Sequence, residues 1–76
     1  MEKYYFTFGC YHRLSDYVQP IVAPNMRLAM AKMFELHGKD WANDYTSEEY
    51  HRNIIEGTLP QKKELEVILY ESRADV

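Results

Sequence analysis

The chain has few of the residues that staple or interrupt a small fold. It holds one cysteine, three glycines and three prolines among 76 residues. A single cysteine excludes an intrachain disulfide, whereas secreted domains of this size usually depend on several. The low glycine and proline content argues against a linker, a collagen-like repeat or a disordered tract. The sequence therefore predicts one folded domain over residues 1–76, located in the cytoplasm, where thiols stay reduced.

Long apolar runs and a strong charge of either sign are also missing. No stretch approaches the roughly 20 apolar residues that cross a bilayer, and the opening residues MEKYY lack the apolar core of a signal peptide. Nine basic and twelve acidic residues give a net charge of −3, which does not favour nonspecific binding to nucleic-acid phosphates. We therefore expect neither a membrane nor nucleic acid to be the partner.

Two β-strands are predicted near the N-terminus. Tyr4, Phe6 and Phe8 recur at the two-residue period of a strand. After a polar loop, residues 17–23 form a second extended segment that contains Pro20. Because proline cannot donate to a sheet ladder, the second strand is expected at a sheet edge or with a bulge. The two segments are predicted to pair as an antiparallel hairpin.

The main helix is predicted between Asn25 and Gly38. Asn25 fits an N-cap, and Gly38 fits the left-handed residue that ends a helix. Between them, apolar residues recur at helical spacing. These positions are Met26, Ala29, Met30, Met33, Phe34 and His37.

A shorter helix is predicted further along. Thr46 and Glu49 fit a capping box, in which each side chain satisfies the backbone amide of the other residue. The helix is expected to run to about Glu56 and to end at Gly57. Trp41, in the loop between the two helices, is expected to fold back over the first helix in a structural role.

A last strand is predicted from Leu65 to about Glu71, with Leu65, Val67 and Leu69 facing the core and the residues beyond it frayed. The expected fold is α+β: a three-stranded antiparallel sheet with one main helix packed on one face and a short second helix, in the order ββααβ. The last strand is expected beside the first, which becomes central.

One main helix leaves the second face of such a sheet open. A tyrosine-rich β surface is too apolar for ordinary contact with water, so a partner protein, a second copy of the chain or the short helix must cover it. Tyrosine is also enriched at binding hot spots. The predicted partner-binding residues are apolar anchors on this face and an acidic rim beside it: Tyr5, Tyr17, Ile68, Tyr70, Asp44, Glu48, Glu49 and Tyr50.

Metal and catalytic sites have weaker support. Cys10 and His12 lie two positions apart, with His37 and His51 elsewhere, and this spacing lacks the paired ligands of a structural zinc site. Cys10 is instead expected to be a small buried residue. The loop offers a thiol and an imidazole, but the sequence shows no oxyanion donors or pocket around them. We expect no metal, no cofactor and no enzymatic activity.

A rival interpretation gives the open aromatic face to single-stranded nucleic acid, whose bases would stack on the tyrosine rings. The chain lacks the interleaved basic and aromatic residues of RNA-binding sheets, since Lys3 is the one cation in the segment KYYFTFG. Binding to a protein is therefore the favoured interpretation.

Several short segments carry a resemblance to a known group. They are YFTFG at residues 5–9, YV at 17–18, residues 26–34, GKDWA at 38–42 and YTSEE at 45–49. Over residues 4–51 the chain resembles small uncharacterised proteins encoded by phages and prophages of Gram-positive bacteria. The resemblance implies a phage accessory protein that acts in the host cell by stoichiometric binding to a host protein, as anti-CRISPR and other anti-defence inhibitors do. A CRISPR or other defence nuclease is the implied partner.

Overall fold

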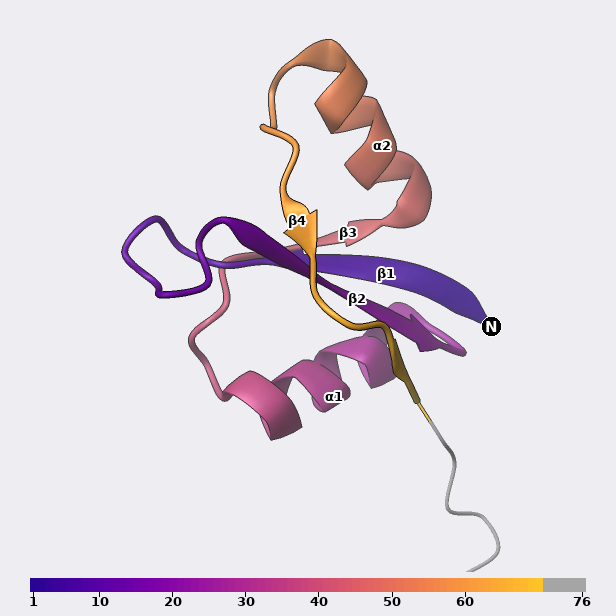
Figure 1. The fold of residues 1–76 in the computed structure, drawn as a ribbon. Coiled ribbons are helices and arrows are strands. Elements are labelled where there is room, and N and C mark those ends of the chain that lie inside the picture. The colour runs from indigo at the N-terminus through magenta and orange to yellow at the C-terminus, as the bar shows by residue number, and fades with distance from the viewer. Residues whose placement is uncertain (71–76) are drawn as a thin grey trace, which may run out of the picture.

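The computed structural model describes residues 1–70 and shows a mixed sheet between two helices (Figure 1). In chain order the elements are β1 (Glu2–Thr7), β2 (Tyr17–Ala23), α1 (Met26–His37), β3 (Asn43–Thr46), α2 (Ser47–Glu56), β4 (Lys63–Glu64) and β5 (Ile68–Leu69). The α+β class and both helices are confirmed. The predicted strand end at Glu71 and the predicted fraying after it lie outside the described residues.

The sheet is larger than expected and is not purely antiparallel. Its order is β3-β1-β2-β4, with β5 also on β2. β1 runs antiparallel to β2 and β3, whereas β4 and β5 run parallel to β2. The prediction of three antiparallel strands is therefore wrong. The unpredicted β3 occupies the free side of β1, so the C-terminal segment docks on β2 instead.

β2 is an interior strand, although Pro20 led us to expect a strand at a sheet edge or one with a bulge. From Val18 to Val22, β2 advances four residues, while its parallel partner advances five, from Glu64 to Leu69. The extra residue forms a bulge opposite Pro20, whose nitrogen has no hydrogen to donate. The bulge therefore lies in the segment between β4 and β5, and β2 itself stays regular at Pro20.

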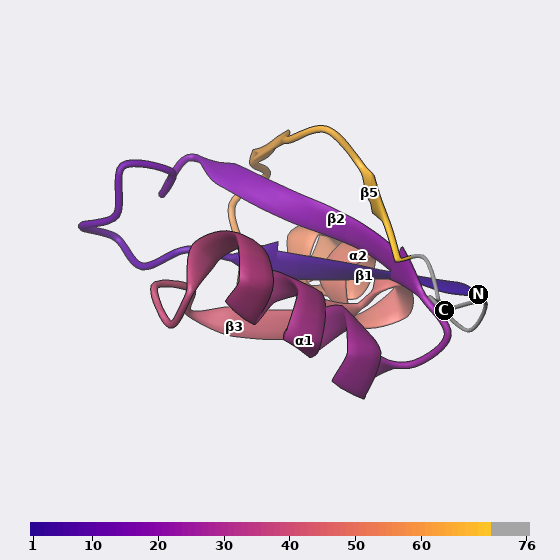
Figure 2. The ribbon, with the colours of Figure 1, turned by 90° about the horizontal axis from the view of Figure 1, so that it is seen from below.

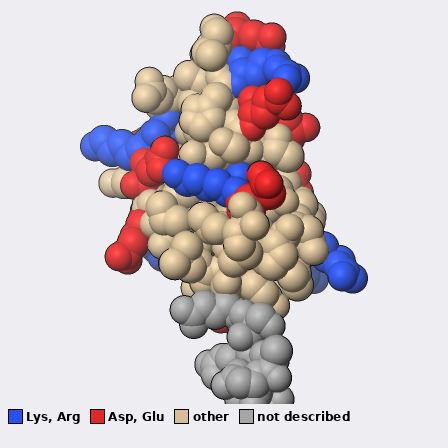
Figure 3. Space-filling model, turned by 90° about the vertical axis from the view of Figure 1, so that its right-hand side faces the viewer, with Lys and Arg blue, Asp and Glu red and all other residues tan. Residues whose placement is uncertain are grey.

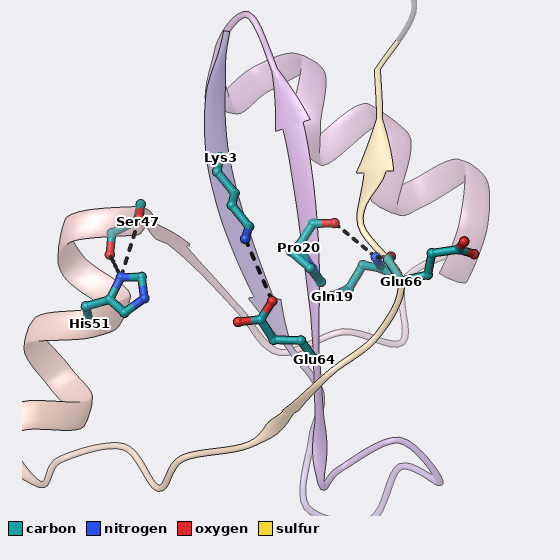
Figure 4. Close-up of polar contacts among 7 residues, drawn as sticks. All are labelled: Lys3, Gln19, Pro20, Ser47, His51, Glu64 and Glu66. Atoms are coloured by element: carbon teal, nitrogen blue, oxygen red, sulfur yellow. Dashed lines mark hydrogen bonds and ion pairs between the residues drawn. The ribbon is translucent and has the colours of Figure 1, made fainter.

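The side chain of Gln19 holds this bulge in place (Figure 4). Its Nε2 donates to the carbonyl oxygen of Glu66 at 2.8 Å and to that of Pro20 at 3.0 Å. Gln19 is buried, so these bonds satisfy a side-chain amide that water does not reach. One buried amide therefore joins the C-terminal segment to the middle of the sheet.

Both helices begin and end where the sequence predicts. The Asn25 side chain accepts from the amide of Leu28 at 2.9 Å, and the chain leaves α1 at Gly38 with φ 64°. At α2 the capping box is complete: the Thr46 hydroxyl accepts from the Glu49 amide at 3.1 Å, and the Glu49 carboxylate accepts from the Thr46 amide at 3.0 Å. Local signals alone determine these four helix ends.

The two helices cover opposite faces of the sheet (Figure 2). On the α1 face the buried core is Tyr4, Phe6, Phe8, Ile21, Ala23, Ala29 and Met33. On the α2 face a smaller core is formed by Tyr5, Val18 and Tyr50, with Tyr45, Ile54 and Leu59 around it. The expected open face is therefore covered. Because β3 runs directly into α2, the helix starts at the sheet and folds back across it.

Neither helix within residues 1–70 is long and apolar enough to span a bilayer.

Candidate partner-binding site

Two of the predicted binding residues are buried inside the protein. Tyr5 and Tyr50 are each 2% exposed, and their rings stack with centroids 4.2 Å apart and planes 8° from parallel. Burial raises the pKa of the Tyr50 hydroxyl, with the nearby Glu64 carboxylate as the next cause. The expectation that these rings form an exposed surface is wrong, because the short helix supplies a partner for Tyr5.

Lys3 and Glu64 border this second core. The ammonium of Lys3 lies 5.2 Å from the centre of the Tyr5 ring and 3.7 Å from the Glu64 carboxylate (Figure 4). The lysine thus adds a cation–π contact to the covered tyrosine. Single-stranded nucleic acid would need the Tyr5 ring to be exposed for base stacking. That ring is instead covered by α2 and bordered by Lys3 and Glu64.

The remaining predicted anchors do not share a face with Tyr5. Ile68 pairs with Ile21, and both Ile68 and Tyr70 pack, half-buried, on the α1-face core. Leu69, which we expected in the core, is 61% exposed. The bulge is the reason, because a shift of one residue moves every later side chain of a strand to the opposite face.

Tyr17 lies elsewhere again, at the start of β2. It lines a hollow of about 330 Å³ together with Asp16 and residues 60–63, which lead into the start of β4. The tyrosine is half-buried there. The predicted anchors are therefore distributed over both faces and one end of the sheet.

The predicted acidic rim has local structural roles. Glu48 and Glu49 are exposed in the first turn of α2, where Glu49 completes the capping box and Glu48 lies 3.4 Å from Arg52. Asp44 is half-buried on β3. On the face that Figure 3 shows, acidic and basic side chains lie next to one another over the upper part of the molecule, where α2 lies. The carboxylates of Glu48 and Glu49 thus stabilise α2.

The β1–β2 loop presents the most exposed aromatic ring of residues 1–70. The side chain of Tyr11 is 100% exposed at the tip of this loop. The loop is nevertheless ordered, because the His12 amide donates to the Gly9 carbonyl at 2.9 Å and the Ser15 amide donates to the His12 carbonyl at 3.0 Å. The Leu14 amide also donates to Nδ1 of His12 at 2.9 Å. Tyr11 is therefore held in water by a structured turn.

A mainly apolar hollow of about 380 Å³ lies beside Tyr11. Two segments far apart in the sequence form its walls, and we call it the loop hollow. Its lining residues are Gly9, Cys10, Tyr11, His12, Asp40, Trp41 and Ala42.

The second wall is fixed by Trp41. Its ring packs edge-on against Phe6 at 5.2 Å and Phe34 at 5.6 Å between centroids, and the next amide, that of Ala42, donates to the Thr7 carbonyl at 2.8 Å. The predicted structural position of Trp41 is confirmed. Sequence reasoning missed that the same residue lines a hollow with Tyr11, although an isolated tyrosine in a polar turn was a signal for exposure.

Cys10, which we expected to be buried, is an exposed free thiol in the first wall of the loop hollow, which residues 9–12 form. Within residues 1–70 the structure shows no hydrogen bond between its sulfur and His12, whose Nδ1 already accepts from Leu14. No cluster of three or more His, Cys, Asp and Glu side chains in the same range could hold a metal. His51 lies away on α2, with Nδ1 donating to the Ser47 carbonyl at 2.7 Å (Figure 4). The expected lack of a catalytic role stays a prediction.

Two histidines contact Phe8 just beneath the loop. The ring centroids of His12 and His37 lie 4.8 Å and 5.0 Å from that of Phe8. Nε2 of His37 is buried without a hydrogen-bond partner among the described residues. Burial lowers the pKa of His37, and the positive charges of His12 and Arg13 lower it further. We therefore predict that protonation of His37 opposes the packing at this end of the molecule.

No protein family, curated protein or solved structure matches this chain.

Proposed function

We propose that this chain is a small binding module that captures a partner protein with one-to-one stoichiometry through Tyr11 and the loop hollow. The observation that carries the proposal is a fully exposed aromatic ring on an ordered loop, next to a mainly apolar hollow. Tyrosine and tryptophan are enriched among residues that dominate binding energy, and rigid loops commonly carry function. Removing the Tyr11 ring from water contributes on the order of 2 kcal/mol to association.

The geometry also favours a binding role for Tyr11 over a role in stabilising the fold. Tyr11 is wholly exposed, so its ring adds nothing to the protein's own core. Trp41 is anchored on its inner side by Phe6 and Phe34 and contributes its remaining surface to the hollow. The hydrogen-bonded loop backbone and the packed Trp41 ring lose little conformational entropy when a partner docks, so the ordering cost falls mainly on the Tyr11 side chain.

The partner class follows from the resemblance to phage and prophage proteins. We propose a host protein, first among them a CRISPR or other defence nuclease, whose working surface is blocked when this chain binds. Such inhibition needs no chemistry by the inhibitor, only occupancy.

The test is capture of a partner from host lysate by the tagged chain, identified by mass spectrometry and followed by titration of the purified pair. The variant Tyr11→Ala should weaken binding about 10- to 100-fold, with unchanged circular dichroism. Ile55→Ala is the matched control, since Ile55 is 84% exposed on α2, away from the loop. The expected result is one-to-one binding that depends on Tyr11 and not on Ile55.

Equal affinity of wild type and Tyr11→Ala would overturn the proposal. So would salt-sensitive binding to single-stranded oligonucleotides in place of a protein, which is the behaviour that the rival interpretation predicts.

A further inference from the structure

We propose that the loop hollow receives a basic side chain of the partner, an arginine or a lysine. This inference rests on the proposed function and names the chemistry of the group that docks. The reasons are the aromatic walls, the carboxylate of Asp40 and the volume of the hollow.

The aromatic walls suit a cation with an apolar stem. The faces of tryptophan and tyrosine rings carry partial negative charge, so they attract ammonium and guanidinium groups within about 6 Å. Tyr11, His12 and Trp41 all line the hollow, and the rest of its surface is mainly apolar. The aliphatic part of an arginine or lysine packs on such a surface while its charged end stays near water.

Asp40 supplies the complementary charge. Asp40 is exposed and lines the hollow, and within residues 1–70 no lysine, arginine or histidine forms an ion pair with its carboxylate. A carboxylate free of internal partners can accept charge-assisted hydrogen bonds from a guanidinium or ammonium group. The net charge of −3 also draws a basic partner surface toward the chain.

The hollow is large enough to admit one side chain. At about 380 Å³ the hollow is at the small end of the range for ligand pockets, roughly 300–1,000 Å³. It is open to solvent, so a side chain can enter from a flat partner surface with Tyr11 packing next to it.

Two cations near the hollow favour a different ligand. Arg13 follows the lining residue His12 in the sequence, and Lys39 precedes the lining residue Asp40. Neither cation lines the hollow itself. Their charge would favour an acidic side chain of the partner. The experiment therefore compares basic, apolar and acidic side chains directly.

Trp41 makes the experiment simple, because it is the chain's one tryptophan and its fluorescence reports on the hollow. Blocked tripeptides Gly-Arg-Gly, Gly-Lys-Gly, Gly-Leu-Gly and Gly-Glu-Gly are titrated into the full chain. The two basic peptides should change the Trp41 emission saturably, with a Kd on the order of millimolar, and binding should weaken with added salt. The apolar and acidic peptides should produce no saturable change.

Asp40→Asn should weaken the Gly-Arg-Gly peptide about 5- to 10-fold, the effect of losing one partner charge at an exposed site. Asp16→Asn is the matched control, because Asp16 is an exposed carboxylate in the other hollow. Its expected effect is none. Equal effects of the two substitutions would show general attraction by net charge and would overturn the proposal.

Preference for the leucine or glutamate peptide, or no saturable change with any peptide, would also overturn it. These failures are separable from failure of the proposed function, because capture of the protein partner can still depend on Tyr11. If Tyr11→Ala leaves partner capture intact, the proposed function fails whatever the peptides show.

Discussion

The two faces of the sheet differ in how clearly the sequence predicts the helix that covers them. The α1 face is built from a strand with alternating aromatic residues and from a helix of 12 residues between clear caps. The α2 face depends on a helix of 10 residues that carries one fully buried side chain, Tyr50. The first face was predicted, and the second was expected to be open. The difference teaches that coverage of a sheet depends on where a helix starts as much as on how much helix there is.

The largest effect tests whether both faces are true cores. Phe6→Ala on the α1 face should cost about 3–5 kcal/mol of unfolding free energy, because Phe6 is fully buried. Tyr5→Ala on the α2 face should cost about 3 kcal/mol, since its core is smaller and its stacking partner Tyr50 can shift. Urea denaturation followed by circular dichroism measures both. A Tyr5→Ala variant as stable as wild type would restore the idea of an open second face.

The next effect tests the segment that joins the two faces at the sheet edge. Gln19→Ala leaves the carbonyl of Glu66 without its buried donor, at a cost of about 1–3 kcal/mol. The amides of Leu65 and Tyr70, which donate to β2, should then exchange with solvent faster than in wild type. Gln61→Ala, an exposed control, should change neither stability nor exchange. Unchanged exchange in Gln19→Ala would mean that the backbone pairs alone hold the segment.

A smaller effect compares the two helix starts. Thr46→Ala at α2 and Asn25→Ala at α1 should each cost about 1 kcal/mol, or about 4–8 °C in Tm. The loss should be larger for Thr46→Ala, because the reciprocal bond to Glu49 is weakened as well. Equal losses of stability in the two variants would contradict this order.

The smallest effect is a pH dependence confined to the α1 face. Burial holds the pKa of His37 below its ordinary value of 6.5, so the unfolded chain binds more protons near that pH. Stability should therefore be fully present above pH 6.5 and should fall as the pH drops toward the lowered pKa. His37→Phe should flatten the dependence between about pH 7 and pH 5. His51→Asn on α2 should leave it unchanged, because His51 is exposed.

An unchanged slope in His37→Phe would assign the acid sensitivity to another group. The natural next variant is His12→Asn, since His12 contacts the same Phe8 ring.

Much of the fold could be read from local patterns. Caps at Asn25, Thr46, Gly38 and Gly57 act through bonds to residues three or four positions away or through one backbone angle, so the sequence reveals them directly. β3 was missed because residues 43–46, NDYT, have no apolar alternation and form a strand only by pairing with β1. The candidate site was missed for a similar reason.

The two walls of the loop hollow lie about thirty positions apart in the chain, at Tyr11 and Trp41. Taken alone, the first wall is an ordinary turn and the second an ordinary loop. Their meeting depends on the length of α1, which returns the chain to the end of the sheet where the β1–β2 loop lies. No local signal encodes that meeting.

The sequence by itself determined the α+β class, the limits of both helices and the alternation that builds the α1-face core, because these depend on neighbours along the chain. Only the tertiary structure decided the parallel docking of the C-terminal segment, the bulge opposite Pro20, the burial of Tyr5 under Tyr50 and the hollow beside Tyr11. Those features arise from contacts between distant residues, where a shift of one position in a strand exchanges its buried and exposed side chains.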